Sequence, residues 1–165
     1  MELTTLNDVA NAMVADGKGI LAADESTGTI GKRFDQINLE STVENRNAYR
    51  DLLFSAKDIE NYISGVIMYY ETFRQSSLDG NILYPQYLSD KGIIPGIKVD
   101  MGAHNLSGTE GEKITEGLDG LNERLSEYRK LGARFAKWRA VIVISEENPS
   151  GYAIATNAHA LARYA

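Results

Sequence analysis

Short apolar stretches of strand length alternate with helical patterns along the whole chain, and this alternation constrains the fold most strongly. The apolar stretches cover residues 19–23, 63–70, 93–99 and 133–144. Strands of a parallel sheet are covered on both faces and therefore show nearly continuous apolar runs. Helices that connect such strands form right-handed βαβ units. The sequence therefore predicts an α/β fold with a parallel sheet.

Apolar spacing and boundary residues predict the helices between these strands. Gly17 and Gly132 each lie just past a helical pattern and act as stop signals. The expected helices cover residues 6–14, a segment from about residue 27, 43–56, 85–91, 118–131 and a segment from about residue 149 to the end. No linker or repeat divides the chain, so we expect one domain over residues 1–165. Four β/α units would form either a small doubly wound domain or half of an eight-stranded barrel.

Charged residues lie on or at the ends of different predicted strands. Asp24 follows the first strand, Lys98 lies near the end of the third, and Lys137 and Arg139 lie in the fourth. Enzymes with a (β/α)8 TIM barrel typically carry catalytic groups at the ends of several strands. This pattern favours the first four units of such a barrel over a doubly wound domain.

The fourth predicted strand carries two cations, Lys137 and Arg139, which are either buried or exposed to water. If residues 133–144 form one strand, side-chain alternation places Lys137 and Arg139 on the face of Phe135 and Val141. A buried cation is costly without an anion nearby, and a phosphorylated substrate would supply one. An edge strand with both cations in water is the alternative, and the strand pattern alone leaves both open.

Composition excludes several classes of function. A formal net charge of -6 argues against a nucleic-acid partner, because phosphate backbones are bound by basic surfaces. The chain has no cysteine and only two histidines, which disfavours zinc chemistry. The first residues show no signal-peptide pattern, and no apolar run approaches the ~20 residues of a membrane span. We therefore expect a cytoplasmic protein without a membrane or nucleic-acid partner.

Five segments resemble those of class I fructose-bisphosphate aldolases, in the family's order and spacing. They are GKGILAADESTG at residues 17–28, ENR at 44–46, GIKVD at 96–100, GLDGL at 117–121 and FAKWR at 135–139. The resemblance implies a TIM barrel, usually in a homotetramer, that cleaves fructose 1,6-bisphosphate to dihydroxyacetone phosphate and glyceraldehyde 3-phosphate. It implies a lysine Schiff base as the electron sink, with no metal and no cofactor.

The resemblance also implies roles for individual residues. Asp24 matches a carboxylate that transfers protons, and Lys137 matches a cation beside the Schiff base. The positions implied to bind substrate and phosphate are Ser26, Thr29, Arg33, Lys98 and Arg139. Two departures are visible: Thr29 stands where serine is common and keeps the hydroxyl, and Met101 stands where lysine is common and removes a cation.

The family continues past the length of this chain, into strands five to eight. The imine lysine and the acid/base glutamate of the family belong to that second half. We therefore expect the chain to be the N-terminal half of an aldolase barrel, inactive alone and in need of the other half. The alternatives are a non-catalytic half-barrel that binds sugar phosphate or partner subunits, and a Schiff-base barrel that uses Lys137 or Lys98 on another substrate.

Each candidate site residue also has an ordinary structural explanation. Asp24 would cap the following helix, unless Ser26 or Thr27 takes that role. The hydroxyls from Ser26 to Thr29 would belong to a common capped helix, although a helix start also binds anions. Lys98 and Arg33 would be solvated surface charges.

Overall fold

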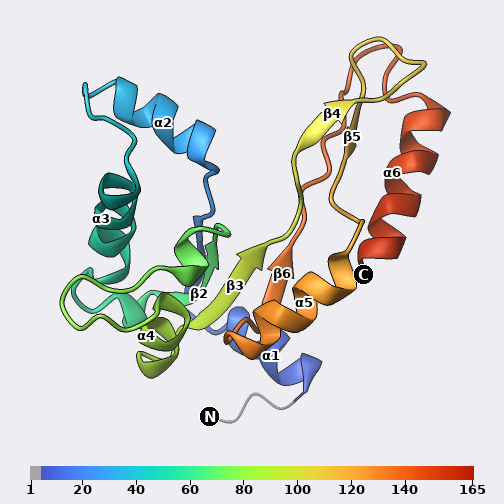
Figure 1. Cartoon of the computed structure of the whole chain (residues 1–165). Coiled ribbons are helices and arrows are strands. Elements are labelled where there is room, and N and C mark those ends of the chain that lie inside the picture. The colour runs from blue at the N-terminus through green and yellow to red at the C-terminus, as the bar shows by residue number, and fades with distance from the viewer. Residues whose placement is uncertain (1–4) are drawn as a thin grey trace. The chain divides into compact units, whose positions relative to one another are not determined.

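The computed structural model describes residues 5–165 (Figure 1). Its elements, in chain order, are α1 Leu6–Met13, β1 Gly19–Ala23, α2 Thr27–Asp35, α3 Val43–Phe54, the 3-10 turn η1 Ile59–Asn61, β2 Ile63–Met68, the 3-10 turn η2 Thr72–Arg74, α4 Tyr84–Asp90, β3 Ile94–Lys98, β4 Ala103–Asn105, β5 Lys113–Thr115, α5 Leu121–Lys130, β6 Phe135–Lys137 and α6 Gly151–Tyr164. Apart from the hairpin β4–β5 and the two 3-10 turns, every element type was expected at its place in the sequence. None of the helices formed by residues 5–165 is long and apolar enough to cross a bilayer.

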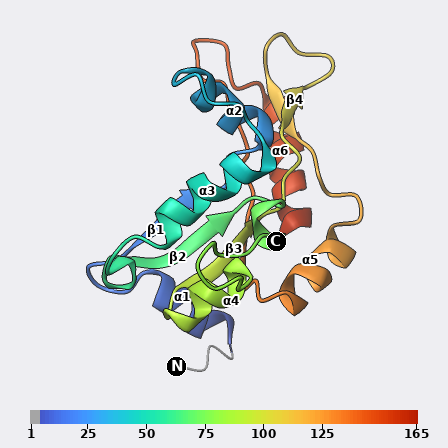
Figure 2. The same cartoon turned by 60° about the vertical axis from the view of Figure 1, so that its left-hand side comes forward.

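The main sheet has the strand order β1-β2-β3-β6, and Figure 2 labels its strands β1, β2 and β3. β1 pairs with β2 in parallel, up to Ala23 opposite Met68, and β2 pairs with β3 in parallel, up to Met68 opposite Ile97. The carboxyl ends of these three strands therefore lie at the same edge of the sheet. The parallel α/β sheet predicted from the sequence is confirmed.

β6 also runs parallel to β3. The amide of Arg134 donates to the carbonyl of Pro95 at 2.9 Å, and the amide of Val99 donates to the carbonyl of Lys137 at 3.1 Å. The two bonds advance in the same direction along both segments, as a parallel pair requires. Lys98 and Lys137 are thus the last residues of two neighbouring parallel strands.

The described residues fall into two compact units. One contains the chain up to Lys98 together with Tyr128–Ala136, and the other contains Val99–Glu127 together with Lys137–Ala165. The first unit holds β1, β2, β3 and the helices α1 to α4. The second holds the hairpin β4–β5 and helix α6. The single domain expected from the sequence stays a prediction.

The core of the first unit lies on β2, β3 and the helices beside them. Val66, Met68 and Ile97 are fully buried, as expected for strands covered on both faces. Phe54 of α3 and Tyr84 of α4 meet edge to face, with ring centroids 5.0 Å apart. These contacts hold α3 and α4 against the same core.

The second unit is built on an antiparallel hairpin that the sequence pattern did not reveal. β4 and β5 pair from Ala103 opposite Thr115 to Asn105 opposite Lys113. Helix α6 lies beside the hairpin, and the Asn157 side chain donates to the carbonyl of Lys113 at 2.9 Å (Figure 1). Both strands are only three residues long, too short for a clear period-two pattern.

The strand expected over residues 133–144 is wrong in length. β6 covers only Phe135–Lys137, and no regular element follows it before Gly151. β6 lies at one end of the sheet order, and its neighbour β3 ends at Lys98. Past that point the backbone has no strand partner on either side among residues 5–165. Arg139 therefore lies beyond the strand and is exposed, so alternation does not place it on the same face as Lys137.

Gly96 is a position in the sheet where a side chain does not fit. A Cβ at this position would lie 2.2 Å from Cζ of Phe135 and within 2.5 Å of two further atoms of that ring. We expect Gly96→Ala to lower the free energy of unfolding by about 1–3 kcal/mol, because the rigid ring must shift within a packed core. Urea denaturation followed by circular dichroism measures the change.

Gly19→Ala is the matched control, because a Cβ at Gly19 in strand β1 meets nothing within 4 Å. Combining Gly96→Ala with Phe135→Leu should recover part of the loss, since the smaller side chain leaves room for the methyl group. Equal stability of the Gly96→Ala and Gly19→Ala proteins would contradict the assigned clash.

Candidate functional site

The loop from β1 to α2 carries the first group of candidate residues. Asp24 directly follows β1 and is half-buried. Ser26 is the N-cap of α2, and its hydroxyl accepts from the amide of Thr29 at 3.3 Å and lies 3.1 Å from the Thr29 hydroxyl. Because Ser26 fills the capping role, Asp24 is not the N-cap of α2. The capping explanation for Asp24 is therefore wrong, and its carboxylate remains a candidate for chemistry.

Glu25 is the centre of a charge network that the sequence analysis missed. Its carboxylate accepts from the guanidinium groups of Arg33 on α2 and Arg50 on α3, one on each oxygen. Arg50 also donates to the main-chain carbonyl of Glu25 at 3.0 Å. The side chain of Glu25 is 11% exposed and that of Arg50 only 2%. A buried arginine at this spacing has no local sequence signal, because its partner lies 25 residues away.

The network shifts the pKa values of Glu25 and Arg33. Burial acts to raise the pKa of Glu25, but hydrogen bonds from Arg50 and the backbone and the charges of Arg50 and Arg33 outweigh it. The net result is a pKa of Glu25 below its usual value. The charge of Glu25, followed by a hydrogen bond to Tyr49, raises the pKa of Arg33. Glu25 and Arg33 are therefore both ionised at neutral pH.

Arg33 lies at the exposed end of this network. Its side chain is 54% exposed, and one guanidinium nitrogen donates both to Glu25 and to the Tyr49 hydroxyl, the latter at 3.2 Å. Arg33 is thus a solvated surface charge that is also tied to Glu25, the residue after Asp24. Its assignment to phosphate binding stays a prediction.

A second buried arginine lies one helical turn before Arg50. Arg46 donates to both oxygens of Glu71, each at 2.7 Å, and to the hydroxyl of Ser41 at 3.3 Å. Glu71 follows β2 closely, as Glu25 follows β1. Helix α3 thus sends two arginines, four residues apart on one face, to the segments that follow β1 and β2.

The remaining candidates follow β3 and β6. Lys98 is the last residue of β3 and is half-buried, and Lys137 is the last residue of β6 and is also half-buried. The carbonyl of Arg139 accepts from the Thr115 hydroxyl at 2.7 Å, which anchors its backbone to β5. Asp24, Lys98 and Lys137 therefore lie on or at the ends of different strands, as predicted, whereas Arg139, which was expected within the fourth strand, lies beyond it.

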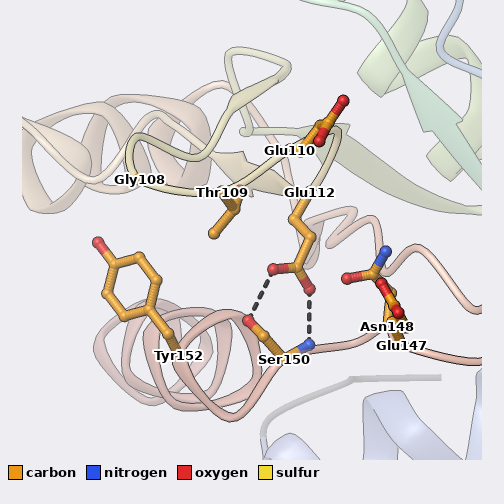
Figure 3. Close-up of a pocket in the computed structure, with 8 residues that line it drawn as sticks. All are labelled: Gly108, Thr109, Glu110, Glu112, Glu147, Asn148, Ser150 and Tyr152. Atoms are coloured by element: carbon orange, nitrogen blue, oxygen red, sulfur yellow. Dashed lines mark hydrogen bonds between the residues drawn. The ribbon is translucent and has the colours of Figure 1, made fainter.

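A separate hollow of about 530 Å³ lies in the second unit (Figure 3). Glu112 is one of the residues that line the hollow. It is 3% exposed, and its side chain accepts from the amide and the hydroxyl of Ser150 at 2.7 and 2.6 Å. Ser150 in turn caps α6 through the amide of Ala153 at 3.1 Å. Figure 3 shows the Glu112 carboxylate directed at Ser150. These bonds hold the start of α6 against the segment before β5, which is a structural role.

No group of three or more histidine, cysteine, aspartate or glutamate side chains within residues 5–165 is arranged to hold a metal ion. The candidate residues offer the carboxylate of Asp24, the hydroxyls of Ser26 and Thr29, and the cations of the lysines and arginines. Parallel strands that end in such groups define an α/β protein with charged groups at its strand ends, an arrangement that fits part of a (β/α) barrel.

Comparison with known proteins identifies the family. Residues 5–165 match the family described as "Fructose-bisphosphate aldolase class-I", and the chain belongs to that family. It is 58% identical over its full length to a probable fructose-bisphosphate aldolase class 1 of Xylella fastidiosa, covering 49% of that protein. It is 54% identical to human fructose-bisphosphate aldolase C over 97% of its own length and 44% of the human chain.

A solved structure supports the same family. The fructose-bisphosphate aldolase of Plasmodium falciparum, solved in complex with TRAP and a small-molecule inhibitor, superposes with a TM-score of 0.90 at 53% identity. The match covers 95% of this chain and 46% of that one. The chain thus spans about half the length of the relatives that it matches, and its sheet corresponds to part of the barrel.

The lowered pKa of Glu25 predicts a pH dependence of stability. A depressed carboxyl pKa stabilises the fold above the ordinary value of 4.5, and that contribution is lost as the pH falls through the lowered folded value. We expect the free energy of unfolding to fall between about pH 6 and about pH 3 more steeply in the wild type than in Glu25→Gln.

Urea unfolding at a series of pH values measures this difference. Glu40→Gln is the control, because this exposed carboxyl lies in the loop before α3. The control should keep the slope of the wild type. A Glu25→Gln protein with an unchanged slope would mean that Glu25 gains no stabilisation from the two arginines.

Proposed function

We propose that the chain is the first half of a class I aldolase that cleaves fructose 1,6-bisphosphate to dihydroxyacetone phosphate and glyceraldehyde 3-phosphate. The observation that carries the proposal is the placement of Asp24, Lys98 and Lys137 at the ends of β1, β3 and β6. The family match over residues 5–165 supports the reaction class. Asp24 would transfer protons around the carbinolamine, and Lys137 would stabilise charge beside the imine.

The sugar phosphate would be held by hydroxyls and cations of this half. Ser26 and Thr29 present hydroxyls at the first turn of α2, where helix amides also favour an anion. Lys98, Arg33 and Arg139 would supply positive charge to the substrate. The imine lysine and the acid/base glutamate would come from the second half of the barrel, so the isolated chain would not cleave substrate.

The proposed function also implies where the protein acts, how it assembles and which cofactors it needs. A glycolytic and gluconeogenic lyase of this class would act in the cytoplasm. The complete barrel would assemble as a homotetramer, as the family usually does. Neither a metal nor a cofactor would take part, because the protonated imine is the electron sink.

Borohydride trapping tests the division of labour between the two halves. With dihydroxyacetone phosphate and borohydride, we expect the 165-residue chain to remain unlabelled. A fusion of this chain to the remaining half of the Xylella fastidiosa relative should be labelled at a lysine of that added half. Mass spectrometry of tryptic peptides locates the adduct.

The same fusion separates the alternatives by its activity. A coupled assay for triose phosphate release should detect cleavage of fructose 1,6-bisphosphate by the fusion. A folded fusion that binds the substrate without cleaving it would favour a non-catalytic half-barrel. A stable adduct on Lys137 of the isolated chain would instead place the imine in this half.

A further inference from the structure

Arg50 binds Glu25, the residue between Asp24 and Ser26 of the candidate site. We propose that Arg50 is a positioning residue for Asp24, acting through the carboxylate and the main-chain carbonyl of Glu25. The inference rests on the proposed function, in which Asp24 transfers protons. Arg50 itself is buried on α3 and is assigned no contact with the substrate.

The first step of the argument is the geometry at Glu25. Arg50 donates one guanidinium nitrogen to the Glu25 carboxylate and another, at 3.0 Å, to the Glu25 carbonyl. One rigid fork therefore holds both the side chain and the backbone of a single residue. Because Glu25 directly follows Asp24 and precedes Ser26, fixing its backbone limits the directions that both neighbours can take.

The second step is the rigidity of the helix that carries Arg50. Arg46 on the same face is bound to Glu71 through two hydrogen bonds of 2.7 Å. Phe54 of the same helix meets Tyr84 of α4 edge to face, with ring centroids 5.0 Å apart. Because α3 is anchored in this way, Arg50 keeps a fixed position and so fixes the loop that it binds. An arginine on a mobile segment could not do this.

The third step is that a gain in stability does not by itself account for the ion pair of Glu25 and Arg50. A buried ion pair adds little net stability over well-packed apolar residues of similar volume, because its attraction is offset by the loss of hydration. The second oxygen of Glu25 is occupied by Arg33, so both carboxylate oxygens are used in setting one orientation. Strict orientation next to a proton-transfer group is the feature that this arrangement provides.

The test uses the fusion with the second half of the relative, after its cleavage activity has been established. Arg50→Lys keeps the charge but has a single nitrogen, which cannot reproduce the fork to carboxylate and carbonyl. We expect kcat to fall about tenfold to a hundredfold, since misplacement of a catalytic group by about 1 Å costs that much. KM should rise by a smaller factor than kcat falls, since Ser26, the other neighbour of Glu25, is only one of several groups proposed to bind the substrate.

Asp51→Asn is the matched control on the same helix. It weakens bonds to Leu78 and Tyr84 and leaves the contacts of Arg50 in place. It should lower the free energy of unfolding and leave kcat within about twofold of the wild type. An equal loss of kcat in this variant would show that general loosening of α3 explains the effect, and would overturn the proposal.

A double-mutant cycle connects Arg50 to Asp24. In an Asp24→Ala background, Arg50→Lys should cost little further activity, because the group that it positions is gone. The same fold loss in both backgrounds, or a loss confined to KM, would overturn the proposal. If Asp24→Ala leaves kcat unchanged, the role of Asp24 in the proposed function fails, which is a separate outcome.

Amide hydrogen exchange gives a readout that needs no activity. Residues 22–30 should exchange at least about tenfold faster in Arg50→Lys and in Glu25→Gln than in Asp51→Asn. Glu25→Gln approaches the same contact from the other side, and it serves if Arg50→Lys does not fold. Unchanged exchange in both variants would show that Arg50 does not hold the loop.

Discussion

Parallel pairing of β1, β2 and β3 is the constraint on which the rest of the first unit depends. Parallel strands bring their carboxyl ends to one edge, so the residues that follow β1 and β2 enter the same neighbourhood. Charged groups gather at that edge, where helices and loops leave room for them. The interior of the sheet is apolar, with Val66 and Ile97 fully buried. Burial thus holds the sheet, and the strand ends carry the charged groups.

Helix α3 binds the charged residues that follow the strands of the sheet. Arg46 binds Glu71 after β2, and Arg50 binds Glu25 after β1. Because a helical face repeats every three to four residues, two arginines four positions apart reach two neighbouring strand ends. Each arginine is buried, so each needs its carboxylate, and each carboxylate has its orientation set in return. Local order at the strand ends is therefore a consequence of α3 packing.

The sequence pattern predicted the elements better than it predicted their extents. The strand at residues 19–23 and the start of the helix at Thr27 are confirmed, because apolar runs and a serine N-cap are local signals. The strand expected up to residue 144 ends at Lys137, since strand length depends on a hydrogen-bonded partner that the sequence does not specify. The hairpin β4–β5 was missed for the same reason, because three-residue strands have almost no pattern of their own.

The sequence by itself determined the parallel α/β class and the presence of charged residues on or at the ends of different strands. These features follow from apolar runs, helical spacing and segments shared with one family, all of which are properties of neighbouring residues. Only the tertiary structure decided which charges meet. Glu25 and Arg50 are separated by 25 residues, and they pair because α3 packs against the sheet in one orientation. The energy of a buried charge depends on its surroundings in space, which no local pattern of residues contains.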